Sequence, residues 1–87
     1  MQTTWMPHTQ SGEIHDRAEL PDSVFAFPAQ RKEPLTDAEH VRNALARFDQ
    51  VEGVTGADRD LAFTNIKKAG EHYGVELHWA SWRELGR

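Results

Sequence analysis

The chain contains no cysteine. Disulfide bonds, thiolate catalysis and cysteine-ligated zinc or iron–sulfur centres are therefore excluded, and the fold must be held together by packing. The 87 residues provide one modest hydrophobic core, but not a doubly wound sheet or a barrel. A content of 38% hydrophobic and 28% charged residues is typical of a soluble globular domain.

Net charge and the N-terminal sequence bear on the partners and the localisation of the protein. The formal charge of −4 at pH 7 argues against a protein whose whole surface binds nucleic acid, although it leaves room for a local basic patch. No apolar stretch approaches the roughly 18 residues of a membrane span, and neither a signal peptide nor a transit peptide is indicated. We therefore expect a cytoplasmic protein that does not associate with membranes.

The first nineteen residues differ from the rest of the chain. Their few large apolar side chains follow neither helical nor strand periodicity, and their acidic residues outnumber Arg17. These properties are typical of a flexible or loosely docked acidic arm. We accordingly expect an arm over residues 1–19 and a single small helical domain over residues 20–87.

The strongest local signal predicts a helix over residues 36–49. Thr36 and Glu39 have the spacing of a capping box, in which the threonine hydroxyl and the glutamate carboxylate bind backbone N–H groups reciprocally. The apolar residues that follow fall on one arc at helical spacing. They are Ala38, Val41, Ala44, Leu45 and Phe48.

A second helix is predicted over residues 56–73. Thr55 and Asp58 repeat the capping signal in a weaker form, and Gly74 is a natural left-handed stop. Gly70 lies on the apolar face of this helix. Because glycine has no side chain, another part of the backbone could approach closely there. Because a short loop joins the two helices, they are expected to form an antiparallel helical hairpin.

Extended segments flank the two helices. Phe25 and Phe27, at i and i+2, would lay two rings on the core from an arm that Pro28 ends. Residues 75–79 alternate apolar and polar, and Ser81 opens one helical turn. The arm and the C-terminal segment are candidates for pairing as a short two-stranded element.

The predicted fold is therefore mostly α. It consists of an antiparallel helical hairpin with an extended N-terminal arm and a short extended segment plus helical turn at the C-terminus. The predicted core takes apolar side chains from all of these parts: Leu20, Val24, Phe25, Phe27, Leu35, Val41, Leu45, Phe48, Phe63, Ile66, Tyr73, Val75, Leu77 and Trp82.

One pattern of residues extends from Leu20 to about Leu77. It comprises Leu20-Pro21-Asp22-Ser23, Phe25-Ala26-Phe27-Pro28, Arg31-Lys32, Pro34-Leu35-Thr36-Asp37, His40-Val41-Arg42-Asn43-Ala44, Ala46-Arg47-Phe48 and Gly74-Val75. With this pattern the chain resembles an uncharacterised bacterial family of domains of unknown function. Looser relatives of the arm and first helix resemble segments of bacteriophage-associated proteins, which implies a portable module. The resemblance implies no activity, cofactor or catalytic residue.

Residues with catalytic or metal-binding chemistry form no recognisable site. Asp58 and Asp60 are two apart on a helix and point to different sides, and no serine has the context of a nucleophile elbow. The five histidines include no i, i+4 pair. We therefore predict a protein that is not an enzyme and that uses no cofactor and no metal.

The leading candidates for contact residues lie on the first helix. His40, Asn43 and Arg47 recur at i, i+3 and i+7, so they can form a ridge that binds a phosphate or a protein carboxylate. Arg31 and Lys32 can reach this ridge from the preceding segment.

A structural interpretation of the same residues stands beside the functional one. His40 can hydrogen-bond the incoming arm, while Arg42 pairs with an acid such as Asp49. At the C-terminus, Trp79 and Trp82 either form an exposed anchor for a partner, together with Trp5 of the arm, or complete a small core.

Two functions remain open at this point. The leading hypothesis is a small non-enzymatic protein-interaction module with a protein partner. The alternative is a weak nucleic-acid-associated module that requires its cations to converge on one face without acids. Those cations would be Arg31, Lys32, Arg42, Arg47, Lys67 and Lys68.

Overall fold

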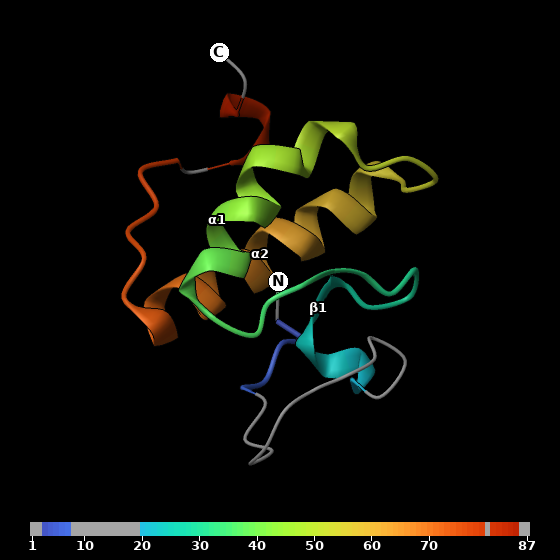
Figure 1. Ribbon diagram of the computed structural model, residues 1–87. Helices are drawn as coiled ribbons and strands as arrows, with labels where there is room; N and C mark the ends of the chain where they lie inside the picture. The colour runs from blue at the N-terminus through green and yellow to red at the C-terminus, as the bar shows by residue number, and fades with distance from the viewer. Residues whose placement is uncertain (1–2, 8–19, 80, 86–87) are drawn as a thin grey trace.

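A computed structural model gives the fold of the chain and describes residues 3–7, 20–79 and 81–85. Two α-helices and a two-stranded antiparallel sheet form its body (Figure 1). The helices are α1 (Ala38–Arg47) and α2 (Gly56–Tyr73), and the strands are β1 (Phe25–Phe27) and β2 (Lys32–Pro34). Short 3-10 helices occur at η2 (Asp22–Val24), η3 (Phe48–Gln50) and η4 (Trp82–Glu84).

The prediction of a mostly α fold built on an antiparallel helical hairpin is wrong, because a β-hairpin is an integral part of the molecule. Phe25 pairs with Pro34, and Phe27 pairs with Lys32. β1 packs against α2, while β2 packs against α1. The described part of the chain is therefore a small α/β fold. Pairing of the arm with residues 75–79 is also wrong, since those residues form no strand.

The sequence did not predict the hairpin, because its turn contains unusual backbone conformations. Pro28 does not end the pairing but begins a turn over residues 28–31, in which the backbone N–H of Arg31 donates to the oxygen of Pro28 at 3.3 Å. Arg31 and Glu33 have φ angles of 53° and 56°, a left-handed region that side chains other than glycine rarely occupy. Neither residue type signals such a conformation, so the sequence gives no sign of this turn.

α2 has the predicted bounds. Thr55 Oγ1 accepts the backbone N–H of Asp58 at 3.1 Å, and Asp58 Oδ2 accepts that of Thr55 at 3.0 Å, which completes the predicted capping box. Gly74 ends the helix in the left-handed conformation with a φ of 75°. The second helix prediction is therefore confirmed at both ends.

α1 is shorter than predicted and begins with a different cap. Asp37, not Thr36, is the N-cap, since its carboxylate accepts the backbone N–H of His40 at 2.8 Å. The capping box of Thr36 and Glu39 is thus wrong. Both candidate cap residues favour this position, and their order alone does not decide between them. After Arg47 the helix tightens into η3.

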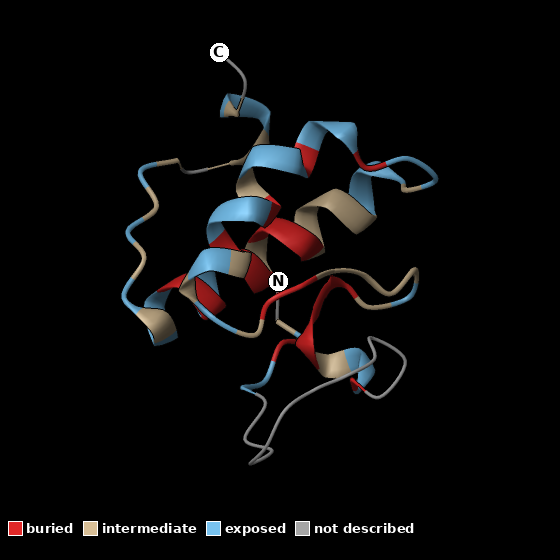
Figure 2. Ribbon diagram, viewed as in Figure 1, coloured by how far each residue is buried: buried red, intermediate tan, exposed pale blue. Residues whose placement is uncertain are grey.

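The core lies where α1, α2 and the hairpin face one another, and Figure 2 shows the buried residues gathered there. Phe48 is central, because its ring centroid lies 5.7 Å from that of Phe27 and 6.0 Å from that of Phe63. Phe25 belongs instead to a smaller cluster with Leu20 and Val24. Some predicted core residues are only partly buried against the main cluster: Leu45, Tyr73, Val75, Leu77 and Trp82.

Trp5 is a core residue that the sequence analysis left outside the core. It lies within the segment assigned to the acidic arm, yet its side chain is only 1% exposed and joins the main cluster. Residues 8–19 of that arm lie outside the described residues, so the arm as a whole stays a prediction. Neither described helix is long and apolar enough to cross a membrane.

Candidate functional site

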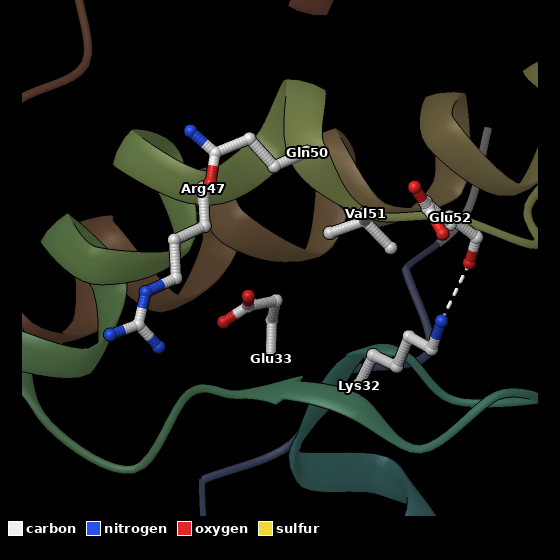
Figure 3. Close-up of a pocket in the computed structure, with 6 residues that line it drawn as sticks. All are labelled: Lys32, Glu33, Arg47, Gln50, Val51 and Glu52. Carbon is white, nitrogen blue, oxygen red and sulfur yellow. Dashed lines mark hydrogen bonds between the residues drawn. The ribbon is translucent and has the colours of Figure 1, made fainter.

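A hollow of about 440 Å³ lies between β2 and the C-terminal end of α1 (Figure 3). β2 contributes two side chains, the last turn of α1 one, and η3 with the loop after it the other three. The lining residues are Lys32, Glu33, Arg47, Gln50, Val51 and Glu52. The fold thus brings together two of the predicted contact residues, which are fifteen positions apart in sequence.

Arg47 dominates one side of this hollow. Its side chain extends from α1 toward β2, and the carboxylate of Glu33 projects from β2 into the same space (Figure 3). Arg47 is exposed, and no described residue forms a hydrogen bond or an ion pair with it. Its guanidinium therefore has donors for a ligand from outside the described chain.

Lys32 defines the opposite side of the hollow. Its Nζ donates to the backbone oxygen of Glu52 at 2.6 Å, which ties the hairpin to the loop before α2. Between Lys32 and Arg47 lies Val51, a largely buried apolar residue. The lining carries two basic and two acidic side chains, so the hollow is balanced in charge rather than basic.

His40 lies at the other end of α1 and does not reach the hollow. Its Nδ1 is 2.7 Å from Asp37 Oδ1, so the ring reinforces the N-cap. Burial raises the pKa of the Asp37 carboxyl, but the hydrogen bonds and the charge of His40 outweigh burial and leave this pKa below 3.8. Asn43 is exposed. Of the predicted ridge of His40, Asn43 and Arg47, only Arg47 lines the hollow, and the ridge itself stays a prediction.

Arg31 also serves the fold, in the contacts that the structure gives. Its guanidinium pairs with the Asp22 carboxylate and donates to the oxygen of Leu20 at 2.7 Å. It also lies 4.7 Å from the centre of the Phe25 ring. These contacts join the hairpin turn to η2. Arg42 is exposed, and the expected pair with Asp49 is not formed.

The C-terminal tryptophans close over the core. Trp79 is half-buried and packs against the main cluster. Trp82 donates its indole N–H to Asp60 at 2.7 Å, and its ring centroid lies 6.0 Å from that of Phe48. This arrangement supports the interpretation that they complete the core, while Trp79 as a contact residue stays a prediction.

The other cations do not gather around the hollow. Lys68 lines a second hollow of about 400 Å³ together with Glu71 and the N-terminal Trp5. Lys67, on the same helix, has its amine 6.0 Å from the centre of the Phe63 ring. Each of the two hollows also contains acidic side chains, so neither is a basic face without acids.

Sequence analysis missed the remaining parts of the hollow. Glu33, Gln50 and Glu52 lie in a turn-distorted strand and in the segment between the helices, where no periodicity marks a shared face. Within residues 3–7, 20–79 and 81–85, no three histidine, aspartate or glutamate side chains come together as a metal-ligand set.

Comparison with known families identifies the domain. A model described as a family of unknown function, DUF6582, matches residues 10–79. The chain belongs to this family. The predicted membership of an uncharacterised family is confirmed. The DUF6582 match contains the hairpin, both α-helices and the whole lining of the hollow around Arg47. No curated protein and no solved structure matches the chain.

Proposed function

We propose that this DUF6582 domain is a non-enzymatic protein-interaction module, and that the hollow between Lys32 and Arg47 receives an acidic side chain of a protein partner. One observation carries the proposal. The guanidinium of Arg47 is exposed beside a second cation and an apolar floor, and it has no partner among the described residues.

The chemistry of the hollow suits a carboxylate. A guanidinium presents paired N–H donors that match the two oxygens of a carboxylate, and such charge-assisted bonds fix orientation as well as adding energy. An exposed ion pair contributes only about 0.2–1 kcal/mol. The contact with Arg47 would therefore supply specificity and alignment, while neighbouring apolar surface such as Val51 supplies further contact area.

The balanced charge favours a protein over a nucleic acid as the partner. A polyanion at this site would lie beside the carboxylates of Glu33 and Glu52 as well as the two cations. A protein surface carries both signs of charge and can match all four side chains. We therefore retain nucleic-acid binding only as the outcome that the experiment must distinguish.

The test compares three forms of the full chain as baits in a native lysate. The wild type and Arg42→Glu should capture the same partner, whereas Arg47→Glu should lose it. Arg42→Glu is the matched control, because Arg42 is also exposed on α1 but does not line the hollow. Equal capture by all three forms would contradict the proposal. Capture that falls steeply with salt and disappears after nuclease treatment would support the nucleic-acid alternative.

A further inference from the structure

Residues 3–7 lie beside β1 (Figure 1). The Trp5 side chain anchors them in a slot of the domain, where it is 1% exposed. The indole N–H donates to the backbone oxygen of Leu35 at 3.1 Å. The ring centroid lies 5.6 Å from that of His72 and 5.8 Å from that of Tyr73. The slot is therefore formed by the segment after β2 and the last turn of α2.

Asn65 clamps the backbone of this segment. Its side chain is fully buried, and its Oδ1 accepts the N–H groups of Thr4 and Trp5 at 2.9 and 3.1 Å. Its Nδ2 donates to the Thr4 hydroxyl at 3.0 Å and to the oxygen of Ala26 at 2.9 Å. The N–H of Met6 donates to the oxygen of Ser23 at 2.9 Å.

These contacts resemble those by which proteins bind peptides. The backbone N–H groups of Thr4, Trp5 and Met6 donate to Asn65 and Ser23, and hydrogen bonds of this kind can hold a segment of any sequence. The bond to the Thr4 hydroxyl and the burial of the Trp5 indole depend on side chains, so they select a threonine followed by a tryptophan. A buried tryptophan is also among the commonest anchors of protein interfaces.

The family match covers the residues that form the slot but not the segment that fills it. Residues 10–79 contain Asn65, Leu35 and the other slot residues, whereas residues 3–7 lie outside this range. The slot residues thus lie within the DUF6582 match, and the segment that fills the slot precedes it in the sequence.

We propose that the slot is a peptide-binding site for an extended protein segment with a Thr-Trp pair, and that residues 3–7 are a tethered ligand that occupies it. The tether gives the occupant an effective concentration on the order of millimolar. A Thr-Trp segment of a partner protein therefore enters the slot only when it displaces residues 3–7. This site is separate from the hollow around Arg47.

The test uses the full chain with Trp5→Ala and a fluorescent peptide that has the sequence of residues 1–7. The peptide should bind this variant at least tenfold more tightly than the wild type, whose slot is filled. A peptide with alanine in place of its tryptophan should lose at least tenfold in affinity. When circular dichroism shows the double variant Trp5→Ala/Asn65→Ala to be folded, it should bind the peptide at least tenfold more weakly than Trp5→Ala, because the clamp on the peptide backbone is then missing.

Trp5→Ala opens a cavity and can unfold the domain, so a second variant with a smaller cavity is included. Trp5→Leu keeps an apolar side chain in the slot but lacks the indole N–H, so it too should bind the peptide more tightly than the wild type. Circular dichroism establishes which variants are folded. If no folded variant binds the peptide more tightly than the wild type does, residues 3–7 are only a part of the core and the proposal is wrong.

Discussion

The side-chain oxygen of Asn65 accepts the backbone N–H of Trp5 at 3.1 Å, across 60 residues of sequence. Asn65 is the buried polar residue on α2 whose two amide atoms each make two hydrogen bonds, to Thr4, Trp5 and Ala26. No buried side-chain polar atom of the described residues lacks a hydrogen-bond partner. The interior of this small domain is therefore sensitive to the loss of one asparagine.

Asn65→Ala should lower the free energy of unfolding by about 3 kcal/mol or more. Several buried backbone groups lose their partner at once, and each unsatisfied group costs about 1–3 kcal/mol. Urea denaturation followed by circular dichroism measures the change. Asn43→Ala, at an exposed position on α1, should change the stability by no more than about 0.5 kcal/mol. Similar losses in both variants would contradict the clamp at Asn65.

Phe48→Ala should cost about 3 kcal/mol or more, because it removes a fully buried ring and leaves a cavity. The lost contacts include those with the rings of Phe27 and Phe63. Thermal or urea denaturation would show the loss. The control is Met6→Ala. Because Met6 is 61% exposed, this substitution should lower the free energy of unfolding much less. A melting temperature unchanged by Phe48→Ala would refute the central position of this ring.

Gly70→Ala should destabilise the domain, although alanine is favoured over glycine in a helix by about 1 kcal/mol. A Cβ at Gly70 would lie 2.6 Å from a methyl group of Leu77 and 2.9 Å from the backbone oxygen of Val75. Overpacking of this kind costs about 1–3 kcal/mol. Gly56→Ala is the matched control on the same helix, because a Cβ there meets nothing within 4 Å. Its melting temperature should equal or exceed that of the wild type.

The stability of the domain should depend on pH through Asp58. The hydrogen bond from the backbone N–H of Thr55 lowers the pKa of this carboxyl below 3.8, with further help from the Thr55 hydroxyl and Gln30. A pKa that is lower in the folded than in the unfolded state adds stability above the unfolded pKa. This stability is lost as the pH falls from about 4 through the folded pKa.

Asp58→Asn should therefore be less stable than the wild type at pH 7, and the difference should shrink toward pH 2. Urea midpoints at the two pH values measure it. Asp49→Asn is the control, because the exposed Asp49 accepts no hydrogen bond from a described residue. A difference for Asp58→Asn that stays constant with pH would mean that the carboxylate charge plays no part in the capping box.

The hollow contains only some of the contact residues that the sequence predicted. Arg47 and Lys32 were among the predicted contact residues, and the fold places both at one hollow. His40 and Arg31 were predicted beside them, but Asp37 and Asp22 bind these side chains elsewhere. Which exposed cation pairs with a neighbouring acid depends on the turns that connect the elements, and those turns carry no periodic signal.

The sequence by itself determined what depends on neighbours along the chain. α2, its capping box at Thr55 and its stop at Gly74 rest on hydrogen bonds between residues three to five apart, so local residue order specifies them. Helical spacing also identified the buried side of both helices. The small Gly70 on that side indicated the close backbone approach that Val75 makes.

Only the tertiary structure decided the hairpin and the position of Trp5. Pairing of Phe25 with Pro34 needs a turn in which Arg31 adopts a positive φ, and its cost is offset by packing of the strands on the helices. Trp5 is buried because an asparagine 60 residues away satisfies its backbone. Interactions between residues so distant in sequence have no local pattern, and their energy exists only once the whole chain is folded.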